Sequence, residues 1–248
     1  MIIHIPHANP TIPPDLRTQF ILSDSELDAE LLRSTDWFTD ELFSTNDHLA
    51  VRFPVSRLVV DPERFEADSS EPMSKVGRGV IYLCTTKRLP LRRPITLGER
   101  TALLERYYYP HHSLLTDAVR SELTKSGNAL IVDAHSFPQF SWTVEPHPGA
   151  ERPDFCVGTN PYHTPAKLVA LAHQFLSSNG YSVLENEPYS GSLVPMEFYQ
   201  RDPRVTSIMI EVNRRTYMDE ANGLRKPQFG RIQSIVAGLL QLFNEFKS

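Results

Sequence analysis

The chain has 248 residues, of which 40% are hydrophobic and 22% charged, and its formal net charge is -5 at pH 7. This length supports one large α/β core, and no linker divides it, so we expect a single domain over residues 1–248. The acidic balance argues against a nucleic-acid partner. No stretch approaches the roughly 18 apolar residues of a membrane span. Two distant cysteines favour a reduced, cytoplasmic protein.

The first quarter of the chain alternates strand-like and helix-like segments. Met1 to Ile5 predicts a core strand, which Pro6 ends because proline cannot donate to a sheet ladder. Residues 25–43 have helical spacing, either as one helix or as two that divide at residues 34–36. Residues 49–60 contain two strand-like apolar runs. The order of these elements is typical of an α/β protein.

A long helix is predicted to begin in the second quarter. Thr96 and Glu99 form a capping-box pattern, and the apolar spacing continues to just before Gly127. Pro110 lies inside this segment, so we expect a kink or a break there. The helix leads into Ala129 to Val132, an apolar run with the branching of a buried strand.

The second half continues the same alternation. We expect strands near residues 154–158, 181–184 and 207–212, and helices near residues 164–178 and 229–246. Long polar loops are expected at residues 140–153 and 186–203. This pattern predicts a three-layer α/β/α fold with a mixed, mostly parallel sheet.

Four strand-like runs end at, or enclose, groups that are costly to bury unless they are paired or bound to metal. They are HIPHA around His7, SRLVVDPER at residues 56–64, VDAHS around His135, and IEVNRR from residue 210. The carboxyl ends of core strands are where open α/β sheets place ligands. The sequence therefore predicts one shared polar site.

The residue types in these stretches suit metal-assisted hydrolysis. Two histidines and a carboxylate leave an open position on zinc, where water is acidified and a carbonyl is polarised. We expect His7 and His135 to be ligands and Glu211 to act as general base. Asp133, two residues from His135, could orient its ring. His4 is a less favoured ligand, because it is expected on a different side from His7.

Taken together, these segments of the sequence resemble the N-formylglutamate amidohydrolase family. The resemblance rests on segments that span most of the chain in family order: PHANP, TDW at residues 35–37, SRLVVDPER, DAHSFP, PYSG at residues 188–191 and EVNRRTYMDE at residues 211–220. The family is similar to zinc carboxypeptidases and aspartoacylase-like deacylases. It implies a zinc-carboxypeptidase-like fold, bound Zn²⁺ or another divalent metal, and a small N-acyl amino acid substrate.

The family pattern assigns roles to further residues. It makes His7 and His135 metal ligands, Glu211 the base and Arg57 the arginine at the oxyanion. Substrate-binding positions in the same motifs are Arg64, Tyr189, Asn213 and Arg214.

The resemblance leaves the third metal ligand open between two aspartates. No carboxylate follows His7 closely, so Asp36 is our first choice and Asp61 the alternative. Related deacylases have D-x-N-R where this chain has Asp61 to Arg64, so Glu63 replaces an asparagine that helps to hold a substrate carboxylate. Glu63 would repel an anion unless it turned away or paired with Arg64.

The expected activity is hydrolysis of the N-acyl amide of an acidic amino acid, such as N-formylglutamate. Two alternatives remain at this stage. One is an amidase or carboxypeptidase that uses the same zinc chemistry on peptides or cell-wall fragments. The other is a binding protein that kept the pocket and lost catalysis, which the change at Glu63 suggests.

Overall fold

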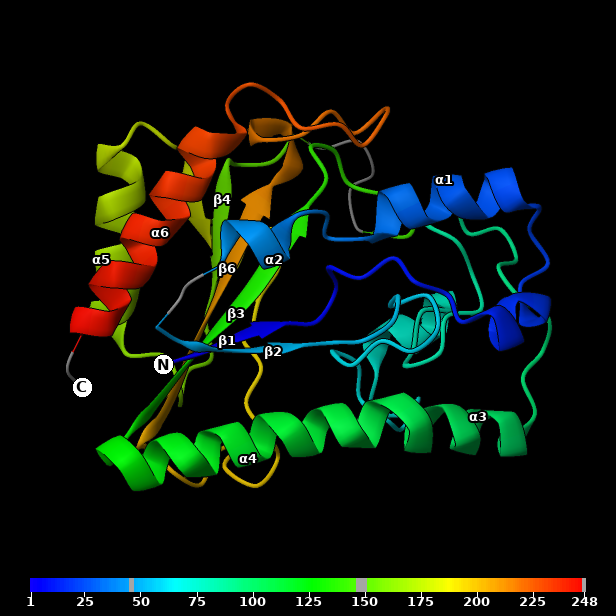
Figure 1. Cartoon of the computed structure of the whole chain (residues 1–248), viewed down its shortest axis with the longest axis horizontal. Coiled ribbons are helices and arrows are strands. Elements are labelled where there is room, and N and C mark those ends of the chain that lie inside the picture. The colour runs from blue at the N-terminus through cyan, green and yellow to red at the C-terminus, as the bar shows by residue number, and fades with distance from the viewer. Residues whose placement is uncertain (45–46, 146–150, 247–248) are drawn as a thin grey trace.

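The centre of the computed structural model is a six-stranded sheet with the order β2-β1-β3-β6-β4-β5 (Figure 1). The structure describes residues 1–44, 47–145 and 151–246. Neighbouring strands are parallel except β4 and β6, which are antiparallel. The strands are β1 (Ile2–Ile5), β2 (Leu49–Arg52), β3 (Ala129–Phe137), β4 (Phe155–Gly158), β5 (Val183–Glu185) and β6 (Val205–Asn213). The expected mixed, mostly parallel sheet is confirmed.

Helices cover both faces of this sheet (Figure 1). On one face, α5 (Ala166–Ser178) and α6 (Phe229–Glu245) share a core with Ile3 and Ile5 of β1. On the other face, α4 (Tyr109–Ser126) shares a core with Ile2. Because side chains alternate along a strand, each strand serves both layers. The predicted three-layer α/β/α arrangement is confirmed.

The same alternation brings polar side chains to the face that α4 covers. Ile131 of β3 packs in the α4 layer, so Asp133 and His135, at even spacing from it, point to that face. Glu211 of β6 is in register with His135 on the neighbouring parallel strand. His4 of β1 pairs with Asp133 in the same way. The fold thus gathers these residues toward the carboxyl ends of β1, β3 and β6.

Strand β3 is longer than the sequence predicts. The apolar run predicts an end after Val132, but the strand continues to Phe137. The reason is that β6 runs beside it throughout, with Phe137 in register with Asn213. Asp133 and His135 therefore lie within a paired strand, which holds their backbone more rigidly than a loop would.

The helical segment predicted at residues 25–43 forms two helices, which is one of the two predicted arrangements. Helix α1 (Asp24–Ser34) begins at a Ser23 capping box, and the short α2 (Thr39–Leu42) follows. Between them, the backbone N–H of Asp36 donates to the carbonyl of His7 at 3.0 Å. The break therefore places Asp36 directly beside the end of β1.

The helix predicted from Thr96 forms with its capping box. Helix α3 (Leu97–Leu103) passes through one π-helical turn, Leu104–Tyr108, into α4. Pro110 lies in the first turn of α4, and the π turn just before it is the expected irregularity. Gly127 ends α4 with a φ of 80°, which glycine adopts without a Cβ clash.

One predicted strand is wrong. The apolar run from Val55 to Val60 forms turns and loop. Leu58, Val59 and Val60 are nevertheless buried, in a separate core cluster under the loops between β2 and α3. The apolar pattern thus predicts the burial of these residues correctly and their backbone conformation incorrectly. Among the helices of the described residues, none is long and apolar enough to cross a membrane.

We expect Glu30 in α1 to be a major source of stability. It is fully buried, accepts hydrogen bonds from the Thr86 backbone N–H at 2.6 Å and hydroxyl at 3.0 Å, and pairs with Arg33 at 2.9 Å. Glu30→Ala should lower the free energy of unfolding by about 3–5 kcal/mol, since these buried donors lose their partner. Urea unfolding measures this. Exposed Asp28→Ala is the control and should change it by less than about 0.5 kcal/mol.

Candidate metal centre and active site

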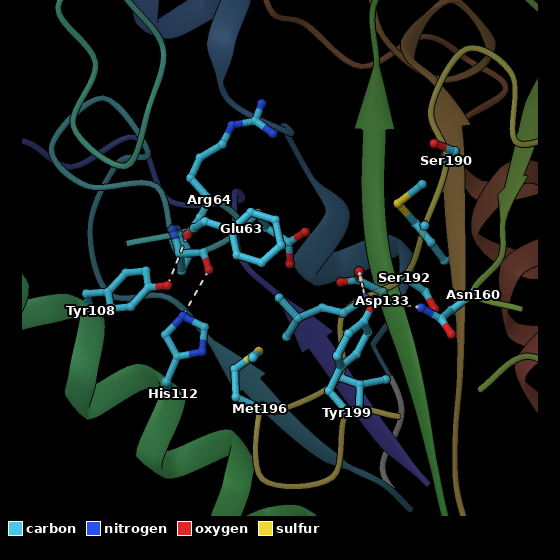
Figure 2. A pocket seen from close by; sticks show the side chains of 16 residues that line it. Glu63, Arg64, Tyr108, His112, Asp133, Asn160, Ser190, Ser192, Met196 and Tyr199 are labelled. Atoms are coloured by element: carbon cyan, nitrogen blue, oxygen red, sulfur yellow. Dashed lines mark hydrogen bonds between the residues drawn. The ribbon is translucent and has the colours of Figure 1, made fainter. Parts of the chain in front are cut away.

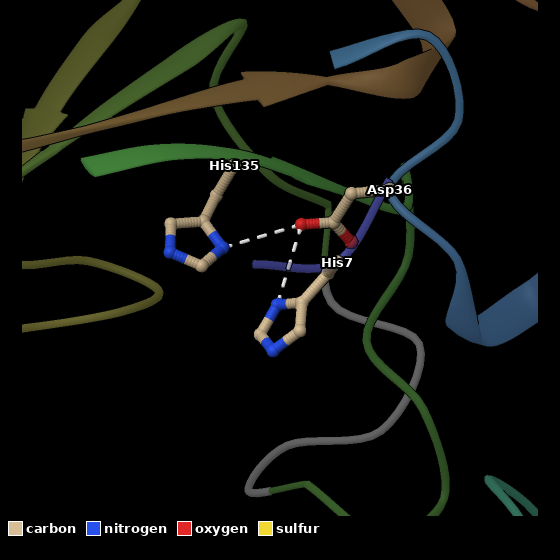
Figure 3. Close-up of side chains that lie close together, drawn as sticks. All are labelled: His7, Asp36 and His135. Carbon is tan, nitrogen blue, oxygen red and sulfur yellow. Dashed lines mark hydrogen bonds and ion pairs between the residues drawn. The ribbon is translucent and has the colours of Figure 1, made fainter. Parts of the chain in front are cut away.

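His7, Asp36 and His135 form a cluster whose ligand atoms all lie within 4.8 Å of one another. They come from the end of β1, the break between α1 and α2, and β3. Oδ2 of Asp36 lies 3.2 Å from Nδ1 of His135 and 3.7 Å from Nδ1 of His7. Figure 3 shows both imidazole rings turned toward this oxygen. The structure brings together three residues that the sequence assigned to a metal site.

The second nitrogen of each histidine contacts a different carboxylate. Nε2 of His7 lies 2.9 Å from Oδ1 of Asp61, and Nε2 of His135 lies 3.1 Å from Oδ1 of Asp133. Such contacts orient metal-binding imidazoles and increase their basicity. Asp61 therefore lies on the far side of His7 from Asp36. This placement favours Asp36 over Asp61 as the third ligand.

The charge states of His7 and Asp36 suit a divalent metal. Burial and the nearby Arg57 lower the pKa of His7, so that its imidazole is neutral. Burial alone would raise the pKa of Asp36, but His135, His7 and Arg214 hold it well below its usual range. Nδ1 of His7 is buried and has no hydrogen-bond partner among the described residues. Two imidazole nitrogens and a carboxylate oxygen match the donor set of a catalytic zinc site.

His135 lies in a strongly negative environment. Burial would lower its pKa, but Asp133, Glu63 and Asp36 together hold that pKa well above the usual value. A field that attracts a proton to this imidazole also attracts a divalent cation, which competes with protons for the same nitrogen.

Arg214 lies behind Asp36, away from solvent. Its side chain is 1% exposed, and its Nη2 donates to Oδ1 of Asp36 at 2.9 Å. Its Nε donates to the Ser136 hydroxyl at 3.1 Å, and its Nη1 to the carbonyl of Arg33 at 2.5 Å. All three guanidinium nitrogens are therefore used inside the protein. In this structure Arg214 positions Asp36, whereas the sequence suggested a substrate contact.

Glu211 is buried on β6, on the same face as His135. It is 5% exposed, and its Oε2 has no hydrogen-bond partner among the described residues. Burial raises the pKa of Glu211 to about 8, and the negative charge of Asp36 adds to this effect. A carboxyl group with a pKa near neutrality can both accept and donate a proton.

Arg57 joins the two aspartates on either side of His7. Its Nη2 donates to Oδ2 of Asp61 at 2.8 Å, and its Nη1 lies 3.9 Å from Oδ1 of Asp36. Its Nε contacts the Tyr82 hydroxyl at 3.1 Å, and that hydroxyl also donates to Asp61. The carboxylate of Asp61 thus holds one side of the Arg57 guanidinium, while the Arg57 side chain remains 11% exposed.

A cavity of about 300 Å³ reaches the cluster through Asp133 and Glu63, which contact His135 (Figure 2). Its wall includes Glu63, Arg64 and Asp133. Glu63 does not pair with Arg64; it lies 3.3 Å from Nδ1 of His4 and 3.6 Å from Nε2 of His135. Arg64 is 25% exposed, and its Nε has no hydrogen-bond partner among the described residues. Nε of Arg64 lies 3.7 Å from Oδ2 of Asp61, so Arg64 is a cation of this wall that is only loosely paired.

The structure places the remaining two predicted residues in internal networks. The Tyr189 hydroxyl contacts Glu145 and accepts from Arg152 at 3.2 Å. Asn213 donates from its amide to the carbonyl of Pro153 at 2.7 Å and accepts from the backbone of Arg215 at 3.0 Å. Asn213 thus shapes the turn after β6.

Sequence reasoning missed the position of Asp61 as partner of His7 and the cluster of His4 with Glu63. A usable signal existed for His4, which stands between isoleucines in a core strand and so had to find a buried partner. The contact between Asp61 and His7 joins residues 54 positions apart, and no local pattern reports it.

Comparison with known proteins identifies the family and the fold. The profile of the N-formylglutamate amidohydrolase family matches residues 1–218. The chain belongs to the N-formylglutamate amidohydrolase family, which supports enzyme activity on a small-molecule substrate.

Two solved structures share the fold. The first is an N-formylglutamate amidohydrolase from Ralstonia eutropha JMP134, with a TM-score of 0.82 and 23% identity over 98% of this chain and 92% of that one. The second is a gene product of Agrobacterium tumefaciens, with a TM-score of 0.67 and 18% identity over 98% of this chain and 91% of that one. No curated protein sequence matches the chain significantly.

Arg214→Met should destabilise the protein by about 3–5 kcal/mol, because it leaves Asp36 buried beside unpaired polar groups. Chemical denaturation followed by circular dichroism measures the change. Exposed Arg201→Met removes the same charge without this contact and should stay within about 0.5 kcal/mol of wild type. Equal stability of the two variants would contradict the role given to Arg214.

Proposed function

We propose that this chain is a metal-dependent amidohydrolase that cleaves the N-acyl amide of an acidic amino acid, with N-formylglutamate as the substrate to test first. The observation that carries the proposal is the convergence of His7, Asp36 and His135, with an aspartate on the second nitrogen of each imidazole. Membership of the N-formylglutamate amidohydrolase family supports the substrate class.

His7 and His135 would hold the metal through Nδ1, and Asp36 through Oδ2. A bound Zn²⁺ or similar divalent ion supplies Lewis-acid polarisation of the amide carbonyl and acidification of water. Asp61 and Asp133 keep the two rings in orientation, and Arg214 keeps Asp36 in place.

Glu211 is the proposed general base. Burial raises its pKa to about 8, so its ionised form is basic enough to take a proton from the attacking water and then passes that proton to the leaving amine. Its unpartnered Oε2 is free for that proton. Its place on a central strand fixes the carboxyl group without help from a loop.

Two arginines are proposed to bind the charges of the substrate. Arg57, held by Asp61, offers its exposed edge to the oxygen that becomes negative during attack on the amide carbonyl. Arg64, on the cavity wall, is available to grip a substrate carboxylate through two hydrogen bonds.

Metal binding should distinguish Asp36 from Asp61. Asp36→Asn is expected to bind one equivalent of zinc less than wild type, because it loses a ligand charge. Asp61→Asn should keep that equivalent with about 10- to 100-fold weaker affinity, the usual effect of removing a histidine's supporting partner. Titration against a competing chelator measures both. The opposite pattern would make Asp61 the ligand.

Catalysis should depend on Glu211. Zinc-loaded wild type is expected to release formate from N-formyl-L-glutamate, and Glu211→Gln should retain its metal while kcat falls about 10²- to 10⁴-fold. Exposed Glu105→Gln is the matched control and should keep full turnover. Undiminished turnover in Glu211→Gln would place the base elsewhere, and wild type without formate release would refute the substrate.

A further inference from the structure

A second group of metal-capable side chains lies beside the first. Single ligand atoms of His4, Glu63 and Asp133 all lie within 4.8 Å of one another. Nδ1 of His4 is 2.8 Å from Oδ1 of Asp133 and 3.3 Å from Oε1 of Glu63. We propose that these three residues hold a second divalent cation, separate from the one assigned to His7, Asp36 and His135.

The group places two carboxylates side by side in a largely buried position. His4 and Asp133 are fully buried, and the Glu63 side chain is 15% exposed. One N–H at Nδ1 of His4 can satisfy only one of the two carboxylates. In keeping with this limit, Oε1 of Glu63 is buried and has no hydrogen-bond partner among the described residues. Adjacent buried carboxylates are costly unless a proton or a cation lies between them.

His111 of α4 allows His4 to act as a ligand. Nε2 of His4 lies 2.8 Å from Nε2 of His111, so that one ring donates and the other accepts. When His4 donates to His111, its Nδ1 presents a lone pair to the two carboxylates. A lone pair at that distance from carboxylate oxygens is repulsive unless a cation lies between them. His4 satisfies His111 in either tautomer. When its proton is on Nδ1, His4 donates to Asp133 and accepts from His111; when its proton is on Nε2, it donates to His111, and Nδ1 is then free to complete a site with one nitrogen and two oxygens.

The distances suit direct coordination. Donor atoms on one cation at about 2.0–2.2 Å are about 3 Å apart at their closest, and the two measured separations of 2.8 and 3.3 Å bracket this value. The nitrogen-and-oxygen donor set suits Zn²⁺ or Mn²⁺. Glu63 and Asp133 also line the cavity of about 300 Å³, which gives the ion a path to solvent.

His135 lies between the two groups. Its Nδ1 faces Asp36, and its Nε2 is 3.1 Å from Asp133 and 3.6 Å from Glu63. The two groups are therefore contiguous, yet they have no ligand atom in common. This separation allows each to be removed by mutation without taking a ligand from the other.

Metal stoichiometry tests the proposal. Chelator-stripped protein is titrated with Zn²⁺ and then with Mn²⁺ in a calorimeter, and bound metal is counted by mass spectrometry after gel filtration. Wild type should bind two equivalents of metal. The Glu63→Gln variant and the Asp36→Asn variant should each bind one equivalent, and the variant that carries both substitutions should bind none. Exposed Glu66→Gln, three residues from Glu63, is the control and should keep two. Circular dichroism confirms that each variant is folded.

Other results would overturn the proposal of a second metal site. Wild type with one equivalent, lost in Asp36→Asn and kept in Glu63→Gln, would eliminate the second site and leave the proposed function standing. Two equivalents in Glu63→Gln would also refute the assignment, as would their retention in His4→Gln, which removes the nitrogen donor. Wild type that binds no metal would refute the proposed metal-dependent activity as well.

Discussion

The carboxylate of Asp36 is the contact on which the arrangement of the site depends. One oxygen faces Nδ1 of both His7 and His135, and the other accepts from Arg214. Because all these groups are buried, none can exchange its partner for water, and each fixes the others. Arg214 compensates the charge of Asp36 from the protein side, which leaves the opposite side of the carboxylate for a metal ion.

The parallel sheet explains why residues so distant in sequence meet at this carboxylate. The strands β1, β3 and β6 are neighbours and run in the same direction. His7, His135 and Glu211 therefore lie near the same end of the sheet, at the carboxyl ends of these strands. The break between α1 and α2 adds Asp36 through a backbone hydrogen bond to His7. The paired strands β3 and β6 keep Glu211 and His135 at a fixed separation, which suits the proton transfer proposed for Glu211.

Local patterns predicted much of this arrangement because they report local physics. Strand alternation, the Thr96 capping box and polar groups at His135 and Glu211 were all visible in the sequence. The patterns could not determine that Val55 to Val60 is loop, since apolar residues bury equally well in irregular structure. They also could not decide between Asp36 and Asp61. That choice depends on which side of the His7 ring each aspartate occupies, and only the folded chain defines it.

The charge of Glu63 links the two halves of the site. In the sequence it looks like a defect in an anion-binding motif, because a carboxylate replaces an amide. In the fold it turns from Arg64 toward His4 and His135, and Arg64 forms only a long ion pair with Asp61 at 3.7 Å. Glu63 therefore does not neutralise Arg64, the cation proposed to bind a substrate carboxylate. At the cavity wall, burial and the nearby Asp133 raise the pKa of Glu63 well above its usual range, and a bound cation there would reverse this effect.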